Sequence, residues 1–330
     1  MSQGKQQFVA AIDIGYSAVK IAAGTKGNKM DVRTLPAGAG PLDLLSKGIS
    51  QQQDDCCVVH IDNKPWAAGV EPYRLQGWAR ALFANYPATP EYKALYYASL
   101  LVCESDKIDY VVTGLPVAQA KDPERVAELR KMMVGKHEIT PKRTVEVAEV
   151  YVLPQPVGAW LDYLGQNNAN AATLEHARVL ILDPGFFSFD WVVIEEGELR
   201  NTQTGTSTAA MSALIEAVDS EIKLEFGGAP GRDKIERAMR DGRMSVTVHG
   251  KEVDLEPYVI AAADVTAPQA LAAMQQNLRT DARPFDAVLL TGGGANIYAP
   301  SVQKLFPKAQ LLKSKETVHA NARGFWSFAQ

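Results

Sequence analysis

Cysteine is scarce in this chain, with three residues in 330: Cys56 and Cys57 are neighbours, and Cys103 stands alone. Neighbouring cysteines rarely form a useful disulfide, and no spacing typical of a zinc site occurs. The low cysteine content therefore excludes a disulfide-rich secreted scaffold and favours packed, reduced thiols. From this we expect a cytoplasmic protein.

Long hydrophobic runs are also missing. No stretch reaches about 18 consecutive apolar residues, the length at which a membrane-spanning helix becomes possible. The first residues, MSQGKQQ, contain no apolar core of a secretory signal. We therefore expect no membrane association.

Positive charge is not in excess either, since the formal net charge is −4. This balance gives no general attraction to nucleic acid or to acidic membrane surfaces, so direct nucleic-acid binding is not expected. Hydrophobic residues at 46% and charged residues at 22% are typical of a globular protein. A length of 330 residues favours two domains.

The most informative stretch is residues 179–193, VLILDPGFFSFDWVV. A short apolar run predicts a buried strand, Asp183-Pro184-Gly185 predicts a turn, and a second apolar run begins at Phe189. Such a hairpin can hold a metal-bound phosphate, because the turn exposes backbone N–H groups while the carboxylate faces the cation. The alternative is an ordinary hairpin in which Asp and Gly serve the turn alone.

The same pattern occurs near the N-terminus. Strand Phe8–Ile12 is followed by the turn Asp13-Ile14-Gly15-Tyr16-Ser17 and by a second strand, Ala18–Ala22. Two strand-Asp-x-Gly-strand hairpins in two halves of the chain indicate a duplicated domain. Together the two hairpins would bind the phosphates of one nucleotide from both sides.

A third signal follows the predicted strand Phe285–Leu290, where the chain reads TGGGAN. Three consecutive glycines between a strand and a helix allow a flat ligand to lie against the backbone. The spacing differs from the G-x-G-x-x-G dinucleotide fingerprint.

Two weaker signals lie at other predicted elements. Gln155 follows the predicted strand Thr144–Leu153, and a neutral amide there can orient a water toward a γ-phosphate; the alternative is a glutamine in a proline-rich loop. The predicted helix 234–240 is highly charged, which is typical of a solvated face but also suits the border of an adenine or ribose site.

In this order, the motifs resemble those of the superfamily of actin, heat-shock chaperones and sugar kinases. They are most similar to bacterial actin-like ATPases of the ParM/StbA plasmid-segregation type, over nearly the whole chain. The resemblance implies an α/β actin-like ATPase fold of two duplicated domains, each with a mixed β-sheet flanked by helices, and a nucleotide in the interdomain cleft. Domain I would be residues 1–158, with the C-terminal helix 318–330 returning to it, and domain II residues 159–317.

The resemblance also implies roles for single residues. The catalytic residues would be Gln155, Asp183 and Asp13, and the two aspartates would hold Mg²⁺ through water. The nucleotide-binding residues would be Gly15, Tyr16, Ser17, Lys20, Gly185, Phe186, Ser188, Gly292, Gly293, Gly294, Asn296, Lys234 and Arg237. One departure is the bulky pair Phe186-Phe187, where the family usually carries small residues, and it affects how the γ-phosphate is approached.

The implied function is hydrolysis of Mg-ATP, with GTP possible, coupled to growth of a head-to-tail filament. The filament would segregate plasmids or other DNA through a DNA-binding adaptor protein. Because Gln155 can position water but cannot accept its proton, we expect modest hydrolysis. The alternatives are a small-molecule, sugar-type kinase of the same fold, for which no obvious sugar-base motif is present, and a non-polymerising actin-like scaffold.

Overall fold

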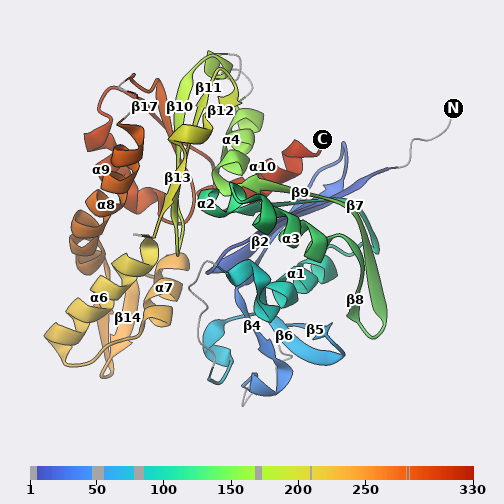
Figure 1. The fold of residues 1–330 in the computed structure, drawn as a ribbon. Coiled ribbons are helices and arrows are strands. Elements are labelled where there is room, and N and C mark those ends of the chain that lie inside the picture. The colour runs from blue at the N-terminus through green and yellow to red at the C-terminus, as the bar shows by residue number, and fades with distance from the viewer. Residues whose placement is uncertain are drawn as a thin grey trace. The chain divides into compact units, whose positions relative to one another are not determined.

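The computed structural model describes residues 6–46, 56–77, 85–167, 173–208, 210–279, 281 and 283–330. Contacts divide the chain into two compact units, Met1–Asn168 with His319–Gln330, and Ala169–Val318. Each unit contains a β-sheet with helices packed against it (Figure 1). The two units are therefore described separately.

The first unit is built on a six-stranded sheet in the order β3-β2-β1-β7-β9-β8. The predicted N-terminal hairpin is confirmed, since β1 and β2 pair antiparallel, whereas β1–β7 and β7–β9 pair parallel, so the sheet is mixed. The strands are β1 Phe8–Ile14, β2 Ala18–Thr25, β3 Asp31–Pro36, β7 Lys107–Leu115, β8 Gly135–Thr140 and β9 Arg143–Pro154.

The alternation of side chains along β1 places apolar residues on both faces of this sheet. Ala10 and Ile12 pack with residues of α1 and α3, and Val9 and Ala11 pack with residues of α10. The helices of this unit are α1 Pro90–Val102, α2 Val117–Ala120, α3 Pro123–Met133, α4 Gln155–Gln166 and α10 Ala320–Phe328. Asp122 caps α3 by accepting hydrogen bonds from the backbone N–H groups of Glu124 and Arg125.

A smaller sheet in the order β4-β6-β5 also belongs to the first unit. Its strands are β4 Gly38–Pro41, β5 Cys57–Ile61 and β6 Lys64–Val70, and the short helical turns nearby are η1 Leu42–Leu44, η2 Pro72–Arg74 and η3 Tyr86–Ala88. It packs against α1.

The second unit repeats the plan with a sheet in the order β12-β11-β10-β16-β17, and β13 pairs with β11. The predicted hairpin is confirmed as β10 and β11, and β17 pairs parallel with β16 at the edge of the sheet. The strands are β10 Arg178–Pro184, β11 Phe189–Glu195, β12 Glu198–Leu199, β13 Gly205–Ser207, β16 Ala287–Leu290 and β17 Gln310–Lys313.

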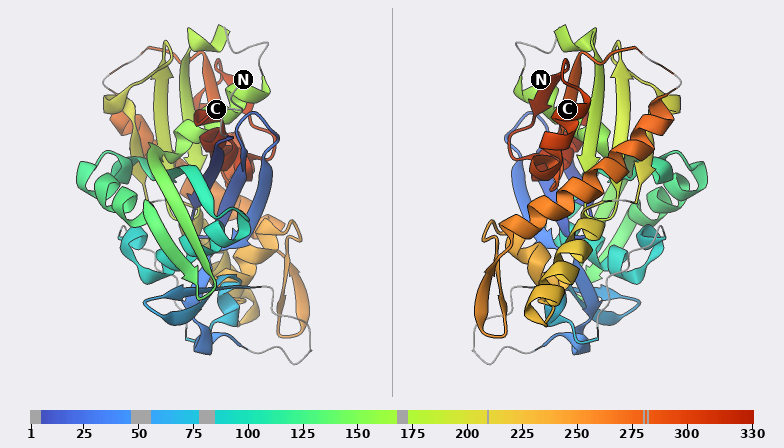
Figure 2. Two further views of the ribbon diagram at one scale, coloured as in Figure 1. Left: turned by 90° about the vertical axis from the view of Figure 1, so that its right-hand side faces the viewer. Right: turned by 90° about the vertical axis from the view of Figure 1, so that its left-hand side faces the viewer.

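Helices cover this second sheet through a buried apolar core. In Figure 2, α8 runs beside α6, and the two helices are in contact. The remaining elements are α6 Met211–Phe226, α7 Arg232–Arg240, α8 Glu256–Leu278, α9 Ala295–Leu305, η4 Asn201–Gln203, η5 Thr317–His319 and the hairpin of β14 Ser245–Val248 and β15 Lys251–Asp254. None of the described helices is long and apolar enough to cross a membrane.

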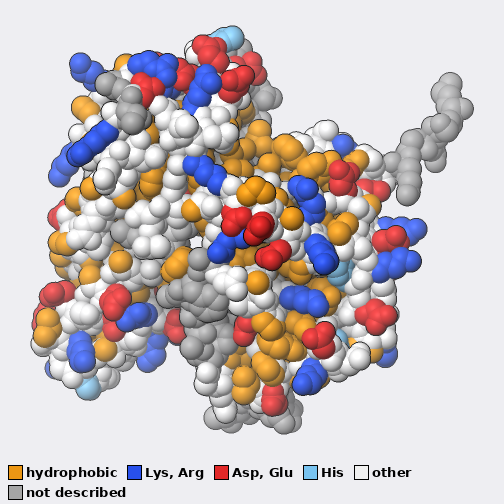
Figure 3. Space-filling model, viewed as in Figure 1, with side chains coloured by type: hydrophobic (Ala, Val, Ile, Leu, Met, Phe, Trp, Pro, Cys, Tyr) orange, Lys and Arg blue, Asp and Glu red, His pale blue; other side chains and the backbone are white. Residues whose placement is uncertain are grey.

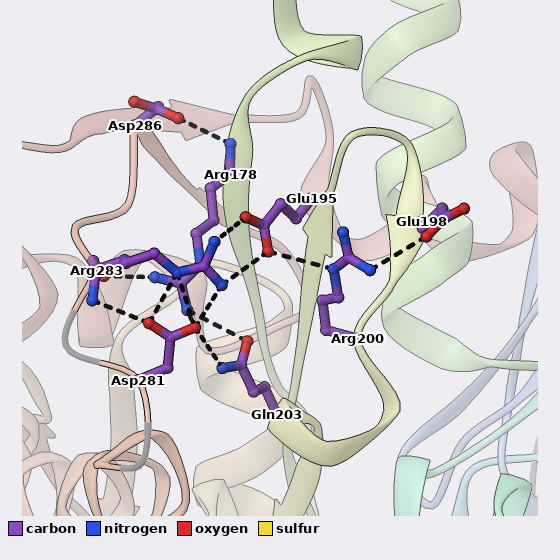
Figure 4. A network of polar contacts seen from close by, with 8 residues as sticks. All are labelled: Arg178, Glu195, Glu198, Arg200, Gln203, Asp281, Arg283 and Asp286. Atoms are coloured by element: carbon purple, nitrogen blue, oxygen red, sulfur yellow. Dashed lines mark hydrogen bonds and ion pairs between the residues drawn. The ribbon is translucent and has the colours of Figure 1, made fainter.

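A polar network ties the segment before β16 to the outer end of the β10–β11 hairpin (Figure 4). Asp281 lies 3.1 Å from Nη2 of Arg178 and accepts a 2.9 Å hydrogen bond from Gln203. Arg283 pairs with both Asp281 and Glu195. The hydrogen bonds from Arg283, and then from Gln203, hold the pKa of Asp281 well below its usual range. This network fixes the hairpin at the end opposite to the Asp183 turn.

Candidate functional site

The first hairpin places Asp13 against Lys20. The two residues are cross-strand neighbours in the β1–β2 register, and Nζ of Lys20 lies 3.5 Å from Oδ2 of Asp13. The other carboxylate oxygen accepts a 2.8 Å hydrogen bond from Nε2 of Gln155. Asp13 is only 3% exposed, and a buried carboxylate needs such partners. Three predicted site residues, Asp13, Lys20 and Gln155, thus lie together.

The close approach of Gln155 depends on the Thr-Gly step at the end of β7. A Cβ at Gly114 would lie 2.9 Å from Cγ of Gln155 and 2.5 Å from the ring of Phe325. Thr113 donates its hydroxyl to the carbonyl oxygen of Ile12 at 2.7 Å and so joins β7 to β1. The Thr113-Gly114 step therefore lies against Gln155.

The turn of the first hairpin is held by backbone and ring contacts. The N–H of Gly15 donates to the carbonyl oxygen of Ala18 at 3.1 Å, and the carbonyl oxygen of Ser17 accepts from Ala37 at 3.2 Å. The ring of Tyr16 stacks on Tyr86, with centroids 4.7 Å apart. The side chain of Tyr16 is thus packed against the core of the first unit. Contact of Tyr16 with a phosphate stays a prediction.

The second hairpin carries two buried carboxylates at cross-strand positions. Asp183 is 6% exposed and Asp190, its partner in the β10–β11 register, is 2% exposed. Asp190 accepts hydrogen bonds of 2.5 Å from the hydroxyls of Ser188 and Thr206. The sequence prediction missed Asp190, although a carboxylate inside the apolar run FDWVV was a usable signal, because such a group is rarely buried without a role.

The glycine motif lies directly against this hairpin. The N–H of Gly294 donates to the carbonyl oxygen of Pro184 at 3.0 Å. Gly292 has a φ of +74°, and a Cβ there would lie 2.1 Å from Oδ1 of Asp183. At Gly293, by contrast, a Cβ would meet none of the described atoms within 4 Å. Two motifs far apart in the sequence, the Asp183 turn and the glycines, are therefore brought together.

Helix α6 begins at the turn of the second hairpin. The N–H groups of Met211 and Ser212 donate to the carbonyl oxygens of Gly185 and Phe186, at 3.3 and 2.8 Å. The N–H of Gly185 donates to the carbonyl oxygen of Ser188 at 2.8 Å. The side chain of Phe186 packs against the core of the second unit. The bulky side chain of Phe186 is therefore accommodated by packing against this core.

Three predicted nucleotide-binding residues lie on helices beyond the hairpin. Asn296, in the first turn of α9, accepts a hydrogen bond from Nζ of Lys313. Lys234 and Arg237 are on α7, which packs against α6 and β14. Contact of these three residues with a nucleotide stays a prediction.

The acidic residues fit a magnesium ion that arrives with a nucleotide. In the part of the chain that the structure describes, no group of three or more His, Cys, Asp or Glu residues could hold a metal ion by itself. Mg²⁺ usually keeps several waters and is bound by one or two carboxylates together with phosphates. Asp13 in the first unit, and Asp183 and Asp190 in the second, each carry carboxylate oxygens of the kind that this mode uses.

Two α/β units that each carry an acidic hairpin define an actin-like architecture, and two family matches agree with it. Residues 11–158 match the N-terminal domain of actin-like proteins, and residues 181–304 match the C-terminal domain of the archaeal MreB-like actin homologues. The chain therefore belongs to the actin-like proteins. No curated protein matches it at a significant level.

Solved structures share this fold over the full chain. An archaeal actin homologue in complex with ADP superposes with a TM-score of 0.73 at 18% identity, covering 98% of this chain and 99% of that one. A ParM from a 15-stranded filament of Clostridium botulinum superposes with a TM-score of 0.70 at 18% identity, covering 98% of this chain and 99% of that one. ParM of Bacillus thuringiensis with AMPPNP superposes with a TM-score of 0.61 at 15% identity, covering 98% of each chain. The predicted actin-like ATPase fold is confirmed.

Proposed function

We propose that this chain is a nucleotide-dependent filament protein that binds and hydrolyses Mg-ATP or Mg-GTP. The observation that carries the proposal is the pair of hairpins, each with a buried aspartate on its first strand. Support also comes from two structural neighbours, an archaeal actin homologue solved with ADP and a ParM solved as a filament.

In this proposal the hairpin turns bind the phosphates through backbone N–H groups, and Lys20 adds a positive charge. Asp13 and Asp183 would hold Mg²⁺ through water, and the ion would neutralise charge on the phosphates. Gln155 already donates its Nε2 to Asp13. That hydrogen bond orients its amide, so that the carbonyl oxygen can accept a hydrogen bond from the attacking water.

The filament would grow by head-to-tail contacts that do not close into a ring. Hydrolysis would weaken these contacts, and a DNA-binding adaptor would couple the filament to a plasmid or other DNA. We retain residues 1–158 with 318–330, and residues 159–317, as the proposed domains I and II.

The test is light scattering with pelleting of the full chain, in Mg-ATP, Mg-ADP or Mg-GTP, alongside phosphate release. We expect scattering to rise with a triphosphate and to decay as phosphate appears. Asp183→Ala and Asp183→Asn should abolish both signals, because each removes the carboxylate. Asp264→Ala, an exposed residue of α8, is the control and should leave both unchanged.

Two other results would contradict the proposal. A flat scattering trace with nucleotide bound and no phosphate released would point to a non-polymerising scaffold. Transfer of phosphate to a small-molecule acceptor would point to a kinase.

A further inference from the structure

A cavity of about 400 Å³ lies within the first unit, outside the residues assigned above to a nucleotide. Its walls are the tip of the β5–β6 hairpin, the segment leading into α1, the end of β7, and helices α2 and α3, which neighbour one another in Figure 1. A volume of this size falls within the usual range of ligand sites.

Gln119 of α2 lines this cavity and has an unsatisfied amide oxygen. The side chain is 8% exposed, and its Oε1 is buried without a hydrogen-bond partner in the described part of the chain. Native proteins rarely leave a buried polar atom unpaired, because the lost hydrogen bonds to water are not replaced. The amide therefore indicates a ligand that donates a hydrogen bond to it.

The remaining inner wall is apolar. Leu115 and Leu129 are almost fully buried, and the partly exposed Met132 lies beside them. Methionine adapts its shape to different apolar groups. Phe, Tyr and Trp are absent from the described lining residues, so none of these residues offers a ring on which a nucleobase or a sugar could stack.

Charges of both signs complete the lining: Lys93 and Arg125 are positive, and Asp62 and Glu128 are negative. In Figure 3, hydrophobic side chains lie between charged ones over α1 to α3. Two charges of each sign favour neither a phosphate nor a polyamine. They suit a chain that carries residues of both signs beside an apolar one.

From these features, we propose that the cavity binds a short peptide segment of another protein. One apolar side chain of the segment packs between Leu115, Leu129 and Met132. A backbone amide of the segment pairs with Gln119, because a peptide group presents one N–H donor and one carbonyl acceptor, which the glutamine amide matches in both directions. Charged residues of the segment, on either side of the apolar one, form ion pairs with the four ionic side chains of the lining.

The test begins with a random heptapeptide library displayed on phage and selected on the full chain, with Gln119→Leu as the counter-selection target. Enriched peptides are then synthesised and titrated by calorimetry. We expect 1:1 binding, an apolar residue flanked by charges, and affinity at least about 10-fold weaker for Gln119→Leu, since one bidentate pair is lost.

Thermal unfolding separates recognition from a structural role. Gln119→Leu should unfold at the same or a higher temperature, because it removes a buried amide oxygen that has no hydrogen-bond partner in the described part of the chain. A second variant, Ala88→Trp, keeps Gln119 and fills the cavity from its exposed wall, and should also lose the peptide. Gln276→Leu on the exposed surface of α8 is the matched control and should bind like the wild type.

The proposal is overturned if no enriched peptide distinguishes the wild type from Gln119→Leu. It is also overturned if Gln119→Leu lowers the unfolding temperature and leaves the affinity unchanged, since the amide is then structural. Loss of self-association in Ala88→Trp, without peptide binding to the wild type, would assign the cavity to a second copy of this chain and would equally reject a separate partner.

Discussion

At the scale of single residues, buried acidic groups are held by donors from their own unit. Asp13 is paired with Lys20 and Gln155, and Asp190 with Ser188 and Thr206. Because a buried carboxylate without partners costs free energy, these donors keep the charged oxygens at fixed positions in the hairpins. The same requirement explains why Ser188 and, through the pairing of β11 with β13, Thr206 lie beside Asp190 in the fold.

His137 is a buried residue with a consequence for pH. Its Nε2 lies 2.8 Å from the carbonyl oxygen of Met133, and the rings of Tyr96 and Tyr97 pack against it. Burial lowers the pKa of His137 below 6.5, the positive charge of Lys93 acts in the same direction, and the hydrogen bond to Met133 opposes them. The folded protein therefore prefers the neutral ring.

We predict that stability falls as the pH drops below about 6.5. In that range the unfolded chain takes up a proton that the folded chain resists, so unfolding is favoured. Thermal unfolding from pH 7.5 to 5.5 should show a smaller decrease for His137→Gln, which can still donate to Met133. His176→Gln is the control, because His176 is exposed and Glu196 raises its pKa. An equal decrease in wild type and His137→Gln would refute the prediction.

At the scale of elements, α4 and α10 cross at two glycines. A Cβ on Gly324 would lie 1.7 Å from the carbonyl oxygen of Gly158, and a Cβ on Gly158 would lie 2.6 Å from that of Asn321. The same two helices are joined by Asp162 and Arg323, which form hydrogen bonds of 2.7 and 2.8 Å in a buried pair. The crossing is therefore close and fixed in direction.

Gly324→Ala should destabilise the first unit. The obstacle is backbone of α4 and cannot rotate away, so the helices must separate, at a cost of about 1–3 kcal/mol. Denaturant unfolding with tryptophan fluorescence measures this. The control is Gly165→Ala. Gly165 also belongs to α4, and a Cβ at this position would have none of the described atoms within 4 Å. That control should be neutral or stabilising by about 0.5–1 kcal/mol, and equal losses in the two variants would contradict the argument.

At the scale of the whole molecule, the proposed cycle of assembly and hydrolysis depends on Gln155. Gln155→Ala removes the amide that would orient the attacking water, and we predict a fall in phosphate release on the order of 100-fold. Nucleotide binding and the initial rise in scattering should persist, and the scattering should decay more slowly. Gln166→Ala, at the other end of α4, is the control. Unchanged phosphate release in Gln155→Ala would exclude the assigned role.

Much of the fold could be predicted because its signals are local. The apolar runs at residues 8–12 and 179–182 predicted the strands that the structure shows as β1 and β10. The strands β4 and β8 were not predicted. The sequence of β4, GAGP, is typical of a loop, and its pairing with β6 depends on Gly38 and Val70, which are far apart in the chain. No local sequence pattern indicates such a pairing.

By itself, the sequence determined that there are two acidic hairpins, a glycine turn after a buried strand, and a family to which their order belongs. These follow from residue spacing and backbone chemistry. Only the tertiary structure decided that Gln155 donates to Asp13, that Gly292 has no room for a side chain beside Asp183, and that Asp190 is buried opposite Asp183. Such contacts join residues that only the folded sheets bring within a few ångströms of each other, so they depend on strand order and register and not on any local run of sequence.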